Sequence, residues 1–190
     1  MTRIAFIFPG QGSQAVGMGK ELADAFPAAR AVFDEVDAAL GEKLSGLVWG
    51  GPEADLTLTA NAQPALMAVS LAAVRALEAG FGIRISQAAF VAGHSLGEYS
   101  ALAAAGALPV TDAARLLRKR GQAMQAAAPA GTGAMAGLIG KVDVAIAETI
   151  ALEGSVAGTV VVANDNNAGN VVISGSKAGV EAAIAAAKAK

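Results

Sequence analysis

The sequence contains no cysteine. Disulfide bonds, thiolate metal sites and a cysteine nucleophile are therefore excluded, and the composition is compatible with the cytoplasm. Aromatic residues make up 4% of the chain and the formal net charge is −2. The chain thus has neither the aromatic platforms nor the basic surface typical of nucleic-acid-binding proteins. We predict no nucleic-acid partner, no metal site and no cofactor.

Long apolar runs are also missing. No stretch of about 18 uninterrupted apolar residues occurs, so no membrane-spanning helix and no membrane partner are predicted. The segment Met1–Phe8 is too short for a secretory signal and is followed by Pro9-Gly10. The hydrophobic fraction of 54% is rich in alanine, which favours closely packed helices. At 190 residues the chain can form a domain together with a subdomain.

The most informative stretch combines an apolar run with a Gly-x-Ser-x-Gly turn. Ala89–Ala92 is expected to be a buried strand, Gly93–Gly97 the turn, and Glu98–Ala105 a helix. In that context the pattern predicts a nucleophile elbow with Ser95 as nucleophile. The glycines would let strand and helix approach each other, and a helix N-terminus favours developing negative charge. The alternative is a plain Gly/Ser connection.

The N-terminal loop invites a competing interpretation. A buried strand is expected over residues 3–8 and a helix over 17–25, and Gly10–Ala15 between them fits the dinucleotide pattern G-x-G-x-x-A. That pattern requires a second strand ending in an acidic residue, whereas Arg30–Leu40 has helical spacing. We therefore predict no nucleotide site. The loop can instead offer a main-chain N–H beside the elbow.

The next segments are read as a loop over residues 41–62 and a helix from Gln63-Pro64 to Gly80, with proline in its first turn. Gln63 could face a pocket at the entrance of this helix. Its apolar positions are expected to line one face that packs on the sheet: Leu66, Val69, Ala73, Val74 and Leu77.

A helix expected from Thr111 to about residue 128 places Arg120 within its apolar stripe. The stripe is Ala113, Leu116, Leu117, Ala123, Met124 and Ala127. A guanidinium on that side needs an anion. The anion could be a structural carboxylate, or Arg120 could bind a substrate carboxylate with two hydrogen bonds. The other cations, Arg115, Arg118 and Lys119, are expected to form a solvated face.

Residues 131–190 predict the order strand, helix, strand, strand, helix, over 134–139, 142–152, 160–164, 170–174 and 177–190. This order is that of a ferredoxin-like subdomain without its last strand. We therefore predict two domains, 1–130 and 131–190. The last helix carries no stop signal. The expectation is that these residues form the N-terminal portion of a longer polypeptide, or one half of a split one.

With these features in view, the chain resembles the malonyl-CoA:acyl carrier protein transacylases of fatty-acid synthesis and the related acyltransferase domains of polyketide synthases. The matching stretches are Phe8–Gln14, Gln63–Ala65, Gly93–Ala101, Arg120-Gly121 and Gly131–Met135. The resemblance implies an α/β fold: an α/β-hydrolase-like parallel-sheet core with an inserted ferredoxin-like subdomain, both incomplete at the C-terminus.

The resemblance also implies roles for individual residues. Ser95 would carry a malonyl ester between malonyl-CoA and acyl carrier protein, and Arg120 would pair with the malonyl carboxylate. Main-chain N–H groups of Gln11 and Leu96 would form the oxyanion hole. The remaining residues implied to lie near the substrate are Gln63, Met124 and His94, with Asn164 as a weaker candidate.

One departure concerns the catalytic base, which in this family is a histidine well downstream of the serine. The single histidine here, His94, directly precedes Ser95 and is expected to be structural or a pocket wall. A C-terminal companion chain could supply the base, and the isolated chain is expected to be inactive. Two alternatives remain: a serine esterase, for which Arg120 would have no use, and an inactive chain that only binds CoA or carrier protein.

Overall fold

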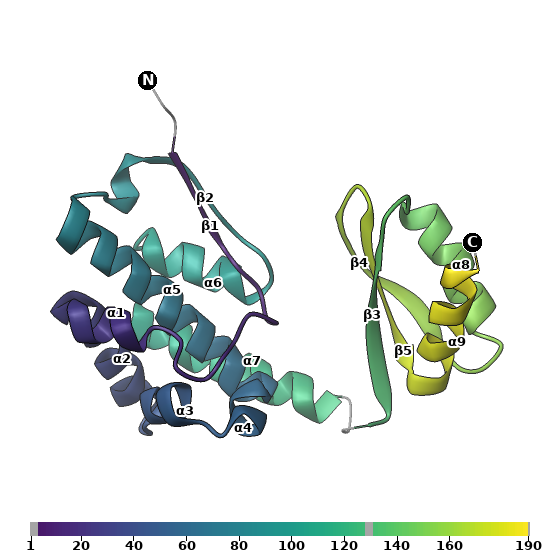
Figure 1. Cartoon of the computed structure of the whole chain (residues 1–190), viewed down its shortest axis with the longest axis horizontal. Coiled ribbons are helices and arrows are strands. Elements are labelled where there is room, and N and C mark those ends of the chain that lie inside the picture. The colour runs from purple at the N-terminus through teal and green to yellow at the C-terminus, as the bar shows by residue number, and fades with distance from the viewer. Residues whose placement is uncertain (1–3, 128–130, 190) are drawn as a thin grey trace. The chain divides into compact units, whose positions relative to one another are not determined.

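A computed structural model describes residues 4–127 and 131–189. The chain divides into two compact units, which comprise residues 1–125 and residues 126–190 (Figure 1). The predicted domain boundary after residue 130 adjoins positions 128–130, which lie outside the described residues. Residues 3 and 190, the outer limits of the first strand and last helix predicted, lie outside them too.

The first unit is built on two parallel strands. β1 (Ile4–Phe8) pairs with β2 (Ala88–Gly93), with Phe6 opposite Val91 and Phe8 opposite Gly93. The helices follow along the chain as α1 (Lys20–Ala25), α2 (Pro27–Leu40), α3 (Leu44–Gly50), α4 (Glu53–Thr57), α5 (Thr59–Phe81), α6 (Leu96–Ala104) and α7 (Val110–Ala127), with a short 3-10 turn η1 (Ile85–Gln87). Because β1 and β2 are parallel, their carboxyl ends lie at the same edge of the sheet.

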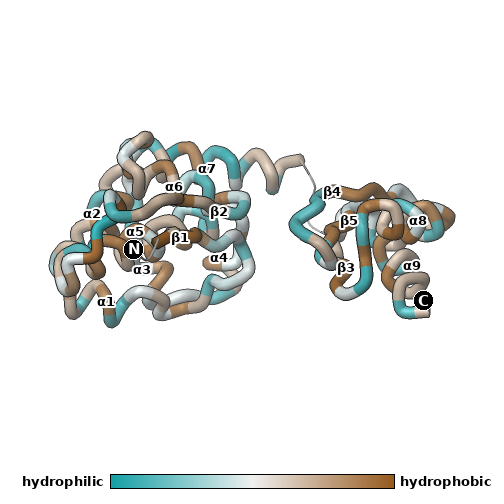
Figure 2. Tube along the Cα trace, turned by 90° about the horizontal axis from the view of Figure 1, so that it is seen from above, coloured by the Kyte–Doolittle hydropathy of each residue, from teal (hydrophilic) through white to brown (hydrophobic). Residues whose placement is uncertain are grey.

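The prediction that both strands are buried is wrong for one face of each. Phe8 is buried, and Phe6 and Val91 pack against the core. In contrast, Ile7 is 78% exposed and Phe90 68% exposed. Successive side chains of a strand point to opposite faces, and the helices described here cover only one of them. Figure 2 shows how continuously hydrophobic β1 is, so hydropathy alone did not distinguish its covered face.

Helix α5 is the centre of the unit. It contacts α1, α2, α3, α4 and α6 (Figure 1), and buried residues lie around most of its circumference between Ala62 and Leu71. The prediction of a single packed face was therefore too narrow. The prediction of a loop over 41–62 was wrong, because α3, α4 and the first turn of α5 occupy most of it.

Helix α5 also bears on the prediction of no membrane-spanning segment, which considered uninterrupted apolar runs only. Among the described residues, α5 is the one helix long and apolar enough to cross a membrane by length and mean hydropathy. Half of that span is buried against the rest of the structure. A central helix of a globular unit passes the same test, and its neighbours assign α5 to that role.

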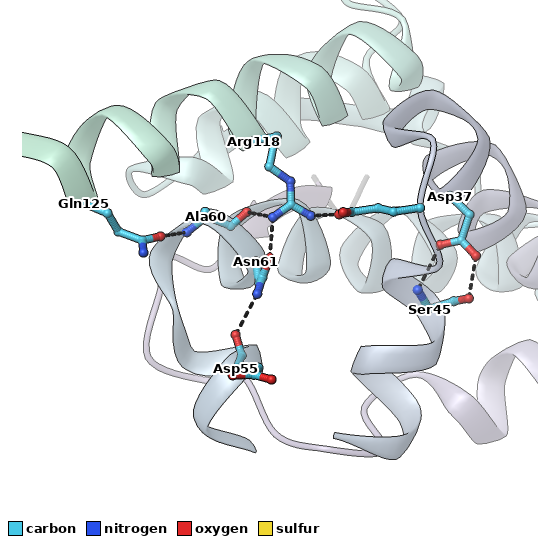
Figure 3. A network of polar contacts seen from close by, with 8 residues as sticks. Asp37, Ser45, Asp55, Ala60, Asn61, Arg118 and Gln125 are labelled. Carbon is cyan, nitrogen blue, oxygen red and sulfur yellow. Dashed lines mark hydrogen bonds and ion pairs between the residues drawn. The ribbon is translucent and has the colours of Figure 1, made fainter. Parts of the chain in front are cut away.

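Pro64 lies inside α5 and not in its first turn as predicted. A proline has no N–H, so the carbonyl of Ala60, four residues earlier, loses its helical donor. Arg118 of α7 supplies one instead, with Nη1 2.8 Å from the Ala60 oxygen (Figure 3). The side chain of Arg118 is only 15% exposed, so its prediction as a solvated cation is wrong.

The remainder of the predicted α7 pattern is corrected in part. The buried face consists of Ala113, Ala114, Leu117 and Gly121. Leu116 and Met124 are about half exposed, at 46% and 47%. The observed face is centred on small residues because α7 lies close to the start of α5: a Cβ on Gly121 would lie 2.5 Å from Ala60 Cα. Side-chain hydrophobicity therefore wrongly placed Leu116 and Met124 on the buried face of this helix.

Asp37 shows how one buried carboxylate starts a helix. Its oxygens accept hydrogen bonds from the Ser45 N–H at 2.9 Å and the Ser45 hydroxyl at 2.6 Å, at the first turn of α3.

We expect Asp37→Ala to lower the free energy of unfolding by about 2 to 3 kcal/mol, since buried hydrogen bonds to a charged acceptor are lost. Asp34 is an exposed residue of α2, the helix that also carries Asp37. Asp34→Ala should change the free energy of unfolding by under about 0.5 kcal/mol. Urea denaturation measures both, and equal effects would contradict the capping role.

The second unit is a three-stranded antiparallel sheet covered on one face by two helices. Its elements are β3 (Gly133–Ile139), α8 (Val144–Gly154), β4 (Val160–Asn167), β5 (Asn170–Ser176) and α9 (Lys177–Lys188), and the strand order is β3-β5-β4. Val171 and Ile173 of β5 face the helices and are fully buried. The predicted α/β class, with a parallel sheet and a small ferredoxin-like sheet, is confirmed.

Local sequence explains where these helices begin and how they meet. Asp143 and Ser176 cap α8 and α9, their side chains accepting from the main-chain N–H groups of Ile146 and Gly179. A Cβ on Gly154 would lie 2.6 Å from that of Ala183. The two helices therefore approach more closely than larger side chains would permit, which agrees with the alanine-rich composition.

Candidate active site

Ser95 connects the end of β2 to the start of α6 in a strained conformation. Its φ is 55° and its ψ is −115°, and it is the one non-glycine residue with positive φ among the described residues. Such a conformation costs of order 1 to 3 kcal/mol and persists where the surroundings enforce it. Ser95 is exposed, whereas Leu96 beside it is fully buried. The strand, turn and helix predicted for a nucleophile elbow are all present.

The glycines of the turn have the mechanical role that the sequence suggested. A Cβ on Gly93 would lie 2.0 Å from the main-chain carbon of Gly97. A Cβ on Gly97 would lie 2.3 Å from the carbonyl oxygen of Phe8. A Cβ on Gly10 would lie 2.6 Å from Nδ1 of His94. The ends of β1 and β2 and the start of α6 are therefore in direct main-chain contact.

We expect Gly93→Ala to lower the free energy of unfolding by about 3 kcal/mol or more, because the added methyl overlaps main-chain atoms that cannot move aside independently. Gly50→Ala is the matched control. No atom lies within 4 Å of a Cβ there, and alanine should stabilise that helical position by up to about 1 kcal/mol. Thermal unfolding distinguishes the two, and a well-tolerated Gly93→Ala would show that the turn is not as tight as described.

Arg120 reaches Ser95 from α7. Its Nη2 lies 3.0 Å from Ser95 Oγ and its Nη1 2.6 Å from Gln63 Oε1. Gln63 is fully buried on α5, and its Nε2 donates to Met124 Sδ at 3.2 Å. Among residues 4–127 and 131–189, no carboxylate forms an ion pair with Arg120. Four residues singled out from the sequence, Ser95, Arg120, Gln63 and Met124, thus lie in one chain of contacts.

The two main-chain groups expected to form the oxyanion hole come from two segments, the loop after β1 and the start of α6. Leu96 is the first residue of α6; the next two N–H groups donate to the carbonyls of His94 and Ser95. Gln11 follows Gly10 in the loop that contacts His94, and its side-chain Nε2 donates to Thr59 Oγ1 at 3.2 Å. No hydrogen bond from either main-chain N–H, Gln11 or Leu96, is found within the described residues.

Two further candidates are His94 and Asn164. His94 donates its main-chain N–H to the carbonyl of Phe8 at 3.1 Å, and its ring lies against Gly10. Asn164 is exposed on β4 of the second unit. In the described part of the chain, no three His, Cys, Asp or Glu side chains are grouped to hold a metal ion.

A cavity of about 560 Å³ lies in the second unit, with apolar walls that include Leu138, Val142 and Ile150. Its lining also includes Lys141 and Thr149, but the Thr149 hydroxyl donates to the Ala145 carbonyl at 3.0 Å, and size alone does not identify the site. The candidate site is placed at the convergence of Ser95, Arg120 and Gln63, which joins a strained hydroxyl to a cation and a buried amide.

Sequence reasoning missed the residues that hold α7 on α5. Besides Arg118, Gln125 binds the same residue of α5: its Oε1 accepts from the Ala60 N–H at 2.6 Å. Thr59, which contacts Gln11, was missed as well. A proline within an apolar helix was the available signal, because it leaves a carbonyl that needs a donor from another segment.

Comparison with known proteins agrees with this geometry. The acyl transferase domain family matches residues 5–190. The malonyl CoA-acyl carrier protein transacylase of Bacillus subtilis strain 168 is 50% identical over 191 residues, covering 99% of this chain and 58% of the relative. The acyl-carrier-protein-S-malonyltransferase structure from Bartonella henselae is 55% identical with a TM-score of 0.90, covering 99% of this chain and 60% of that one.

A further solved structure contains a type II PKS acyl-carrier protein in complex with its malonyl-transacylase. It is 44% identical, with a TM-score of 0.88, over 99% of this chain and 60% of that one. The chain thus spans about three fifths of the length of these proteins. It belongs to the acyl transferase domain family, within which it is similar to the malonyl CoA-acyl carrier protein transacylases.

Proposed function

We propose that this chain provides the acyl-binding part of a transacylase that moves a malonyl group from coenzyme A to the phosphopantetheine thiol of acyl carrier protein. The observation that carries the proposal is the hydrogen bond from Arg120 to Ser95 Oγ, which sets a permanent cation beside an exposed hydroxyl at a strained turn. The names of the relatives support malonyl as the acyl group and acyl carrier protein as the acceptor.

Transfer would proceed in two halves through an ester on Ser95. In the first, Oγ forms a bond to the thioester carbonyl carbon, the C–S bond breaks, and CoA leaves as the thiol with the proton of the hydroxyl. In the second, the phosphopantetheine sulfur forms a bond to the ester carbonyl carbon, the bond from that carbon to Oγ breaks, and the proton of the thiol passes to Oγ. The main-chain N–H groups of Gln11 and Leu96 would stabilise both tetrahedral intermediates, each donor contributing about 3 kcal/mol.

Arg120 would select the acyl group. The carboxylate of a malonyl thioester lies one methylene from the reacting carbonyl, so its anion site must adjoin the nucleophile. Arg120 meets that requirement, and its contacts with Gln63 and Ser95 use two of its five N–H donors. The remaining donors can bind a carboxylate, while buried Gln63 keeps the guanidinium plane oriented.

In this proposal none of these residues accepts the proton of the Ser95 hydroxyl. A serine hydroxyl is a weak nucleophile without an adjacent base. The ring of His94 lies against Gly10, a position that suits a wall of the site better than a base for Ser95. We infer that a histidine outside these 190 residues takes the proton, and that the isolated chain is inactive.

Incubation of the full natural protein with radiolabelled malonyl-CoA tests the proposal. An acid-stable ester on Ser95, discharged by the thiol of acyl carrier protein, is the expected result. Release of free malonate at the same rate with and without carrier protein would indicate a hydrolase. Failure to label any residue would reject the acyl-enzyme.

A further inference from the structure

Outside the candidate active site, the guanidinium of Arg118 contacts three other residues. It donates to the main-chain oxygen of Ala60 at 2.8 Å and also contacts Asn61 Oδ1 and Glu42 Oε1. Asn61 in turn donates its Nδ2 to the carbonyl of Asp55 at 2.8 Å. Figure 3 shows this network running from α7 through the start of α5 to α4 and the segment after α2.

The contact with Ala60 answers a specific deficiency. Pro64 removes the N–H that would bind this carbonyl, and the N–H of Ala60 lies in the first turn of α5, where helices have no internal acceptor. Both groups are satisfied from α7, the carbonyl by Arg118 and the N–H by Gln125. Gly121 lies between these two residues and lets the main chains meet.

Arg120 depends on the same helix pair. It is two residues from Arg118, and its Nη1 binds Gln63, one turn after Ala60 on α5. A sliding or rotation of α7 along α5 would therefore move the guanidinium relative to both Gln63 and Ser95. A shift near 1 Å at a reacting centre can cost a factor of about 100 in rate.

We propose that Arg118 is a positioning residue that sets the selectivity of the site for acyl groups bearing a carboxylate. By binding the carbonyl that Pro64 leaves open, it holds α7 in the register on α5 at which Arg120 meets the substrate anion. The proposal rests on the proposed function, because it needs Arg120 as the carboxylate ligand.

The test compares malonyl with acetyl transfer in the full natural protein. Arg118→Met should lower the malonyl rate relative to the acetyl rate by about 10-fold or more, because only the malonyl group uses Arg120. Lys119→Met is the matched control: it removes a neighbouring exposed cation of the same helix and should leave the ratio unchanged. If folded Arg118→Met lowers the malonyl and acetyl rates by the same factor, the proposal is overturned.

A double variant adds a second readout. In Pro64→Ala/Arg118→Met the new N–H at position 64 can donate to the Ala60 carbonyl within α5, but it does not join α7 to α5, so the malonyl-to-acetyl ratio should stay low. If Arg118→Met does not fold, Arg118→Lys replaces it: a single ammonium cannot reach all three acceptors, and the ratio should fall by a smaller factor. An unchanged ratio in folded Arg118→Lys, or a full return of the ratio in Pro64→Ala/Arg118→Met, contradicts the proposal.

Arg120→Ala in the same assay separates the two levels of inference. If it leaves the malonyl-to-acetyl ratio unchanged, the proposed function of Arg120 fails whatever Arg118 does. If Arg120→Ala lowers the ratio and Arg118→Met does not, the proposed function stands and the positioning role of Arg118 is wrong.

Discussion

Ser95→Ala is expected to abolish the acid-stable malonyl label and to lower transfer by at least about 10⁴-fold, as removal of a serine nucleophile does in other enzymes. The reason is covalent: without Oγ no ester can form, and the thioester would have to react directly with the second thiol. Mass spectrometry of the intact protein after exposure to malonyl-CoA measures the first effect. Transfer to acyl carrier protein measures the second.

Ser100→Ala is the control for this variant. Ser100 lies on the same helix, is fully buried, and its hydroxyl has no hydrogen-bond partner in the described structure. Its removal should leave labelling and transfer unchanged. A malonyl ester that persists in Ser95→Ala, or a comparable loss in Ser100→Ala, would show that Ser95 is not the nucleophile.

Arg120→Ala should lower malonyl transfer by about 100- to 10,000-fold, because two charge-assisted hydrogen bonds of about 1.5 to 3 kcal/mol each are lost. Acetyl transfer should fall by less than about 10-fold, since an acetyl group has no carboxylate to bind. The smaller loss would come from the contacts of Arg120 with Ser95 and Gln63, which serve every acyl group. Steady-state rates with the two CoA thioesters give the comparison.

Arg120→Lys refines the same prediction. Lysine keeps the charge but lacks the planar pair of donors, so malonyl transfer should recover only in part. Lys119→Ala, at the exposed neighbouring position, should change neither rate. Equal losses of malonyl and acetyl transfer in Arg120→Ala would assign the arginine to the structure of the helix pair and not to the substrate.

The elbow was predictable because its physics is local. The strand, the sharp turn and the helix each follow from the residues between Ala88 and Ala104, and the glycines are required by main-chain contacts only a few residues apart. The ferredoxin-like order of the second unit was predictable for a similar reason. Alternating apolar residues indicate the period of the strands. The caps Asp143 and Ser176 mark where α8 and α9 begin.

Contacts between distant segments were not predictable. Arg118 and Arg120 lie on one helix and share the same chemistry, yet the first binds a carbonyl 58 residues away and the second binds Gln63 and Ser95. Their environments differ because Gly121 and Pro64 set how closely α7 and α5 approach. The exposed face of β1 escaped prediction for the same reason, since hydropathy does not reveal which face of a strand other elements cover.

By itself the sequence determined the turn that presents the Ser95 hydroxyl, the α/β class and the family resemblance, because each depends on neighbouring residues and their intrinsic backbone preferences. Only the tertiary structure decided which arginine reaches the hydroxyl, which one is bound in a structural network, and that Gln63 is a buried partner of Arg120. These outcomes depend on the packing of α7 against α5, where an offset of two residues, about half a helical turn, would bring Arg118 to the face that Arg120 occupies.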